Sequence, residues 1–184
     1  MASGRHILHS HHGLYGITVW SPTVVKALTG GNPVLVGVLN AVLYAFALAA
    51  MLIVGRSSDR RNERFLHTAL PLLFAAVGYI AVGYSAPIAP LLAFLALVLA
   101  AMGQYGFYPP FWPIQQGMLA GEARAVAVGL VNSVGNLGGY LGPYMVGWIN
   151  QTTGSSYAGL LFLAGSVVLS SILIFIARRL YGRA

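Results

Sequence analysis

Charged residues occur in this sequence in short clusters, and long stretches without a single charge lie between them. Three such stretches are residues 27–55, 65–121 and 125–177. A helix of about 20 apolar residues crosses a bilayer, so these stretches are long enough for one, two and two spans. Only 7% of the 184 residues are charged, against about 25% in soluble domains. The sequence therefore predicts an all-α, polytopic transmembrane helical bundle.

Six spans are expected. The first segment, about Gly13 to Leu28, is too short to cross the hydrocarbon alone, and we interpret it as a clipped helix. Turn signals divide the two longest stretches at residues 85–90 (SAPIAP) and 150–156 (NQTTGSS). The predicted organisation is an N-terminal tail or clipped helix start at 1–12, a six-helix transmembrane bundle at 13–180 and a cytoplasmic tail at 181–184.

The basic residues predict the orientation of these spans. The loops at 29–33, 85–90 and 150–156 contain no Lys or Arg, whereas the alternate clusters at 56–64 and 122–124 and the C-terminal residues 178–184 hold eight of the ten basic residues. Short loops rich in Lys and Arg stay in the cytoplasm. We therefore expect a multi-pass protein of the plasma (inner) membrane with both termini cytoplasmic.

Several other classes of function are disfavoured. The net charge of +7 follows the membrane topology and forms no basic face, so nucleic acid is not an expected partner. The absence of cysteine excludes disulfides and thiolate metal sites, and the histidines near the N-terminus lack a ligand spacing. Hydrolysis would require Ser166 and His67 to converge beside oxyanion donors. We expect no enzyme, no metal site and no cofactor.

A polar face is predicted on the span after residue 124. Asn132, Asn136 and Tyr140 recur at every fourth position, so a helix places them on one face. An unpaired polar group in hydrocarbon costs on the order of several kcal/mol. This face is therefore expected to contact water, a partner helix or a ligand. The glycines between residues 135 and 142 form small-xxx-small pairs, which indicate close helix packing.

Aromatic and amide side chains mark the span before it. Tyr105, Tyr108 and Trp112 form a stripe at helical spacing, and Gln104 precedes them. Such a stripe is found in cores more often than in sites, but three prolines between 109 and 113 must bend the helix. Broken helices line cavities in transporters. Both interpretations stay open for Tyr105 and Trp112.

The polar cluster between the second and third spans reads GRSSDRRNER, residues 55–64. As a plain loop it only sets topology. Alternatively, Gly55 permits a close backbone approach, and Asp59 can bind a helix N-terminus or a neighbouring Arg. The cluster would then latch helices together in one conformation and release them in another.

The cluster resembles the G-x-x-x-D-R-x-x-x-R loop of the major facilitator superfamily. The segments YGITVWSPTVVK and FWPIQQGMLAGEARAVAVGLVNSVGNLGGYLGPYMVGWI resemble its anion:cation symporter branch, whose members carry organic acids such as tartrate, phthalate and galactonate. The resemblance covers about Leu14 to Arg179 and corresponds to the C-terminal six of the family's twelve spans. Most proton- and carboxylate-binding groups of the family lie in the other six.

The resemblance implies half of a secondary active transporter that works by alternating access, with a small organic acid as substrate and H⁺ as the coupling ion. It implies a partner in the bilayer, either an N-terminal six-helix half or a second copy. The alternative is a non-transporting six-helix membrane protein, a remnant or an interaction subunit. The implied gating residues are Asp59, Arg60 and Arg64, and the implied substrate-binding residues are Asn132, Asn136, Trp112, Tyr105, Tyr15 and Gln104.

Overall fold

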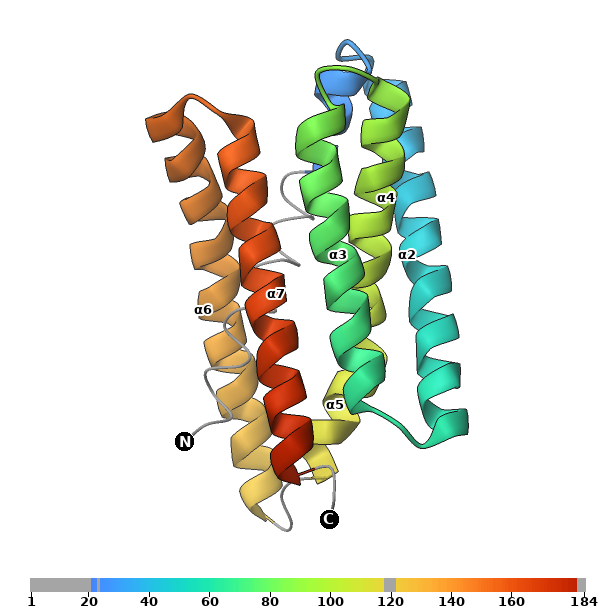
Figure 1. Ribbon diagram of the computed structural model, residues 1–184, viewed down its shortest axis with the longest axis vertical. Coiled ribbons are helices and arrows are strands. Elements are labelled where there is room, and N and C mark those ends of the chain that lie inside the picture. The colour runs from blue at the N-terminus through green and yellow to red at the C-terminus, as the bar shows by residue number, and fades with distance from the viewer. Residues whose placement is uncertain (1–20, 23, 118–121, 182–184) are drawn as a thin grey trace.

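The computed structural model describes residues 21, 22, 24–117 and 122–181. The described part is all-α and contains no strand, as the charge pattern predicts (Figure 1). Most of the first expected span lies outside the described residues, although residues 24–28 are helical. The helices are α2 (Pro33–Arg61), α3 (Phe65–Ser85), α4 (Pro90–Gly106), α5 (Tyr108–Gly117), α6 (Glu122–Thr153) and α7 (Ser156–Tyr181).

Four stretches of helix in the described residues are long and apolar enough to cross a membrane. They are Pro33–Arg61, Phe65–Ser85, Pro90–Gly117 and Tyr157–Tyr181. The third combines α4 and α5, which meet at a break beside Pro109 and Pro110. α6 is longer still, at 32 residues, but its asparagines, tyrosines and glycines lower its mean hydropathy.

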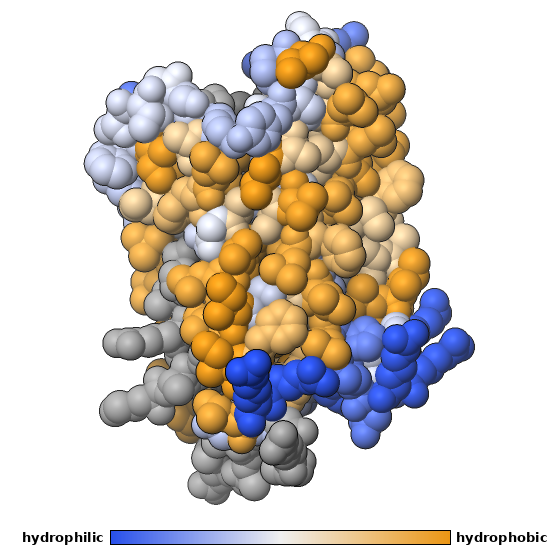
Figure 2. All heavy atoms as spheres, in the orientation of Figure 1, coloured by the Kyte–Doolittle hydropathy of each residue, from blue (hydrophilic) through white to orange (hydrophobic). Residues whose placement is uncertain are grey.

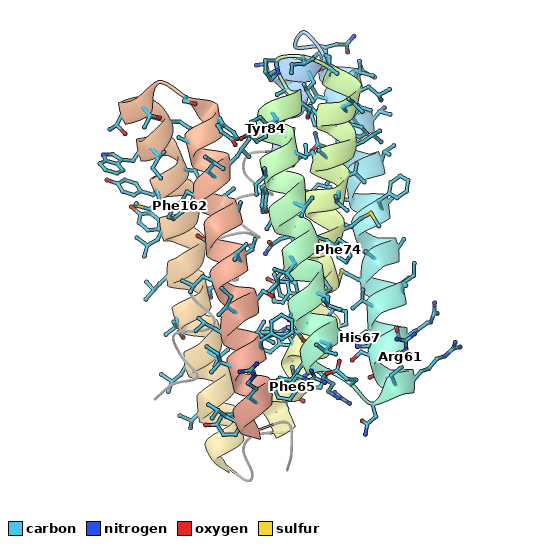
Figure 3. All side chains as sticks on the ribbon, viewed as in Figure 1. Arg61, Phe65, His67, Phe74, Tyr84 and Phe162 are labelled. Atoms are coloured by element: carbon cyan, nitrogen blue, oxygen red, sulfur yellow. The ribbon has the colours of Figure 1, made fainter. Side chains whose placement is uncertain are left out.

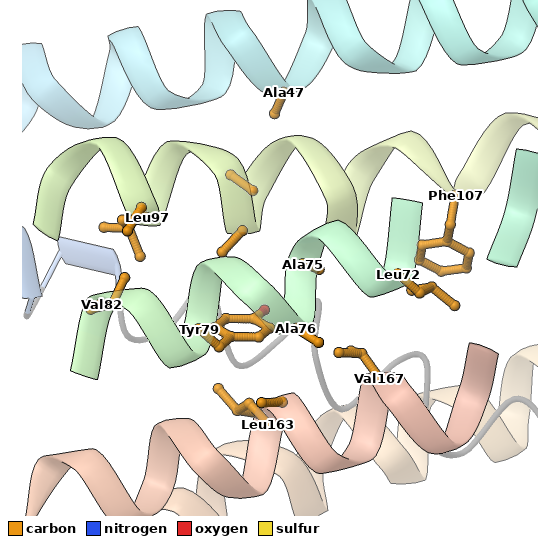
Figure 4. Packing of buried hydrophobic residues seen from close by; sticks show 14 of the residues in the cluster. Ala47, Leu72, Ala75, Ala76, Tyr79, Val82, Leu97, Phe107, Leu163 and Val167 are labelled. Carbon is orange, nitrogen blue, oxygen red and sulfur yellow. The ribbon is translucent and has the colours of Figure 1, made fainter. Parts of the chain in front are cut away.

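α3 lies at the centre of the packed bundle, with α4 on one side and α7 on another (Figure 1). Figure 4 shows Tyr79 of α3 next to Leu163 of α7, and Leu72 near Phe107. Gly78 lets α3 approach α4, since a Cβ there would lie 2.5 Å from the backbone nitrogen of Ala100. Small residues permit such close contacts between membrane helices.

The α2–α3 connection is shorter than the sequence predicts. The expected polar loop over residues 56–64 is wrong in its extent, because α2 continues to Arg61 and only residues 62–64 leave the helix. Polar residues do not end a helix that has already left the hydrocarbon. Asn62 ends it with a left-handed backbone (φ 47°), and its N–H bonds to the carbonyl of Asp59.

The face seen in Figure 2 is largely apolar along the length of the bundle. Strongly hydrophilic residues gather at the end where α2 meets α3. Large exposed apolar side chains on α2 and α3 include Val38, Phe46, Ile53, Phe74 and Val77. Hydrocarbon is the solvent that such a surface suits, so this is a membrane protein.

Candidate functional site

The polar face expected on α6 is exposed in the structure. Asn132, Asn136 and Tyr140 all lie on the surface, and the ring of Tyr140 stacks on that of Tyr144 with centroids 6.2 Å apart. Trp148, one turn further on, is 53% exposed. Amide and phenol groups on a membrane helix require hydrogen-bonding partners or water. The face is therefore suited to an aqueous cavity or to a second helical unit.

The opposite side of α6 packs inward. The small residues Gly135, Gly138, Gly139 and Gly142 are all buried. This arrangement is the one expected from their spacing, because residues without side chains let another helix approach closely. α6 thus carries a packing face of glycines and an exposed face of polar and aromatic side chains.

The candidate residues on α4 and α5 lie in a different environment. Gln104 is fully buried, while Tyr105 and Trp112 are half-buried against the apolar core. The Tyr105 ring meets Tyr44 of α2 edge-on, with centroids 5.8 Å apart. The structure therefore gives Tyr105 and Trp112 packing roles within the bundle, in addition to any contact with a ligand.

The two groups of candidates are not brought together within the described residues. α6 packs on α7 and touches α5, but it makes no contact with α4 there. Asn132 and Asn136 on α6 therefore lie in a different part of the bundle from Gln104 and Tyr105 on α4. Tyr15 lies outside the described residues.

Gln115 on α5 is a further candidate. Its amide nitrogen and oxygen are both buried, and neither has a hydrogen-bond partner in the described part of the chain. A buried amide left unpaired costs about 1–3 kcal/mol. Its place after Pro113 was the available sequence signal, since prolines disturb the regular helix packing there.

The residues expected to act as a gate lie at the hydrophilic end. Asp59 pairs with Arg64 at 3.9 Å, but the Asp59 side chain is 74% exposed, and Arg60 is exposed too. Pairs this exposed contribute about 0–1 kcal/mol. Gly55 makes the close approach that the sequence predicts, because a Cβ there would lie 3.1 Å from Pro109 Cβ.

Glu63 organises this end of the bundle, a role that sequence reasoning missed. Its carboxylate accepts hydrogen bonds from the backbone N–H of Leu66 at 2.9 Å and of His67 at 3.2 Å. The imidazole Nδ1 of His67 lies 3.1 Å from Oε2, and Arg178 Nε of α7 lies 3.5 Å from Oε1. The spacing of Glu63 and His67 was a possible signal, whereas nothing local indicates Arg178.

The environment of Glu63 favours its charged form. Burial raises its pKa, but the bonds from Leu66 and His67, together with the charge of Arg178, outweigh burial and leave the pKa below its ordinary value of 4.5. His67 Nε2 also meets Ser57 Oγ at 3.0 Å. Figure 3 shows His67 at the end of the bundle where Arg61 ends α2.

The arrangement needed for hydrolysis by Ser166 is not present. Ser166 Oγ donates to the carbonyl of Phe162 within α7, and the His67 ring is bonded to Ser57 and Glu63 instead. No group of three or more His, Cys, Asp or Glu side chains that could hold a metal occurs among the described residues.

The chain is similar to bacterial transport proteins over most of its length. It is 40% identical to the "Putative tartrate transporter" of Agrobacterium vitis, over 91% of this chain and 38% of the relative. It is 34% identical to the "Quinolone resistance transporter" of Acinetobacter baumannii, over 89% of this chain and 37% of that one. It is 35% identical to the "Inner membrane transport protein RhmT" of Escherichia coli (strain K12), over 90% of this chain and 38% of that one.

The chain is homologous to bacterial membrane transporters. The names of these relatives are consistent with the resemblance to transporters of the major facilitator superfamily. The chain described here spans less than two fifths of the length of these curated relatives. No family model matches it, and no solved structure shows significant similarity to it.

Proposed function

We propose that the chain forms one half of a secondary active transporter for small organic anions in the plasma membrane. The observation that carries this proposal is the similarity to named transporters over 91% of the chain. A tartrate transporter among the relatives favours a carboxylate as substrate. The remaining length of the relatives is enough for a second bundle, and rocking of two bundles about a central site is the usual mechanism of such transporters.

In this proposal the exposed face of α6 lines the substrate path. Asn132 and Asn136 donate to carboxylate and hydroxyl oxygens, and α5, which contacts α6, contributes Trp112 to the same path. Tyr105, Gln104, Tyr15 and Gln115 are proposed as further polar contacts. Asp59, Arg60 and Arg64 gate the cytoplasmic end, where exposed charges can break and reform contacts at low cost.

H⁺ is proposed as the coupling ion, and both termini are proposed to lie in the cytoplasm, which the distribution of basic residues favours. The partner is an N-terminal six-helix unit, or a second copy of this chain. Either would cover the polar face of α6, which hydrocarbon solvates poorly.

Reconstitution tests the proposal. Vesicles containing this chain, with or without the N-terminal half of the Agrobacterium vitis relative, are assayed for labelled tartrate uptake driven by a pH gradient. We expect uptake only when both halves are present. Uptake by this chain alone, with a crosslinked dimer, would identify a second copy as the partner. No uptake from correctly inserted halves, over a panel of organic acids, would favour the non-transporting alternative.

A matched variant tests the assignment of the site. In the assembly that transports, Asn136→Ala should raise the substrate concentration for half-maximal uptake by about 10-fold, the loss expected from one or two hydrogen bonds. Insertion should be unchanged, because Asn136 is exposed on α6. Ser133→Ala is the control, since Ser133 is also exposed but lies off the Asn132–Asn136 row. Equal uptake by Asn136→Ala and the unmutated chain would remove Asn136 from the site.

A further inference from the structure

Four side chains from four parts of the chain meet at the hydrophilic end, and we name them the Glu63 cluster. Ser57 comes from α2, Glu63 from the α2–α3 connection, His67 from α3 and Arg178 from α7. His67 is central, with one ring nitrogen 3.0 Å from Ser57 Oγ and the other 3.1 Å from Glu63 Oε2. Glu63 in turn reaches Arg178 at 3.5 Å.

The side chains of the Glu63 cluster are partly buried and still reach water. The side chains of His67 and Glu63 are 16% and 24% exposed, and that of Arg178 is 45% exposed. Water can therefore deliver a proton, while the contacts are buried enough to sense each other's charge. Histidine is the side chain whose charge ordinarily changes between pH 5 and 8.

We propose that His67 is a proton-binding site that controls how firmly Glu63 holds α7 through Arg178. With a neutral ring, His67 Nδ1–H donates to Glu63 and Ser57 O–H donates to Nε2. Glu63 then has Arg178 as its one cationic partner in the cluster. A proton taken from water binds Nε2, which becomes a donor to Ser57, and the Ser57 hydroxyl turns to a carbonyl of its own helix.

Proton uptake changes the balance of charge on Glu63. The carboxylate is then shared by two cations, and the imidazolium repels Arg178. The contact between the α2–α3 connection and α7 weakens, while the contact between Glu63 and His67 strengthens. The low pKa of Glu63 keeps the carboxylate charged throughout this range, so the proton resides on the ring.

Among the described residues of this end, His67 is the one side chain whose charge ordinarily changes between pH 5 and 8. Asp59 and Arg64 pair with each other at 3.9 Å, outside the described bonds of His67. α4 and α5 also pack on α3, and the only titratable side chains that they contribute at this end are tyrosines. The remaining charged or titratable residues of α2 and α7 at this end are Arg56, Arg60, Arg61, Arg179 and Tyr181.

The test uses the whole chain in lipid vesicles and does not depend on transport, so its failure is distinct from failure of the proposed function. The sequence has no cysteine, which allows spin labels at introduced cysteines alone. Arg61→Cys and Leu180→Cys place labels at exposed positions on either side of the Glu63–Arg178 contact. The distance between the labels is measured from pH 5 to pH 8.

We expect the distance distribution to shift toward longer values as the pH falls through this range. His67→Gln should stay at the short distance at every pH, and His67→Lys should show the long distance even at pH 8. Arg179→Gln, which alters an exposed neighbour of Arg178, should respond as the unmutated chain does.

Two results would overturn the proposal. One is an unmutated chain whose distance does not change between pH 5 and 8. The other is a pH-dependent shift that persists in His67→Gln, which would assign the response to another group. Circular dichroism verifies that each variant is folded, and Ser57→Ala, which leaves the Glu63–His67 contact in place, must retain a pH response.

Discussion

Single polar side chains at the ends of α3 and α5 have effects that their local sequence does not reveal. Gln115 is the clearest example, because both polar atoms of its amide are buried without a hydrogen-bond partner in the described part of the chain. Folding must offset this loss elsewhere. Such a residue is retained more readily if a ligand bonds to it than if it serves packing alone.

Replacing Gln115 separates these two roles. Gln115→Leu should raise the free energy of unfolding in detergent by about 1 kcal/mol, since it removes the unpaired amide at similar volume. In the reconstituted assembly it should lower tartrate uptake. Gln116→Leu is the control, because Gln116 is exposed and should change neither quantity. A loss of stability in Gln115→Leu would mean that the amide has a partner in the folded protein.

Glu63 gives a pH dependence whose sign follows from its environment. Its pKa is lower in the folded protein than its ordinary 4.5, so its contribution to stability is present above that value and disappears as the pH falls through the folded pKa. Glu63→Gln should therefore cost about 1 kcal/mol at pH 7, and the difference from the unmutated chain should vanish in strong acid. Thermal melting at pH 7 and pH 3 measures both. A difference independent of pH would exclude the charged form as its origin.

At the scale of helices, close backbone contact decides how the bundle packs. α3 meets α4 at Gly78, where a Cβ would lie 2.7 Å from Ala100 Cα. α3 also meets α7, where the buried Ser171 hydroxyl donates to the Ala69 carbonyl at 3.0 Å. Hydrogen bonds between membrane helices contribute modestly, averaging about 0.6 kcal/mol, so fit between the helices carries most of the stability.

A glycine substitution tests this balance. Gly78→Ala should destabilise the folded chain by about 1–3 kcal/mol, because the new methyl group overlaps backbone atoms that cannot move aside. Gly37→Ala on α2 is the matched control, since no atom lies within 4 Å of its added Cβ. That change should be neutral or stabilising by up to about 1 kcal/mol. Equal melting temperatures for the two variants would contradict the close α3–α4 contact.

For the whole molecule, the surface and the charge distribution predict one orientation in the membrane. The ends of α2 and α7 carry arginines, whereas the α6–α7 connection carries none. A cysteine at exposed Arg61 should be labelled by a membrane-impermeant reagent only from the cytoplasmic side, and one at exposed Thr152 only from the opposite side. Labelling of both positions from the same side would exclude the proposed topology.

The sequence by itself determined the class of fold and the main divisions of the chain. Long uncharged stretches can fold stably only as helices within a bilayer, because each backbone group must find its partner inside the segment. The turn at residues 85–90, the close approach at Gly55 and the shared face of Asn132 and Asn136 also follow from local spacing. The turn expected at 150–156 is right in place but wrong in extent, because α6 continues to Thr153 and α7 begins at Ser156.

Contacts between helices were decided only by the tertiary structure. No periodicity indicates that Arg178 reaches Glu63, that His67 joins Ser57, or that α6 makes no contact with α4 in the described chain. The cluster at 55–64 shows the same limit, because its charges mark the edge of the hydrocarbon but not the end of α2. Local sequence determines which side chains share a face of a helix. The partner that each side chain contacts depends on how the helices pack against each other.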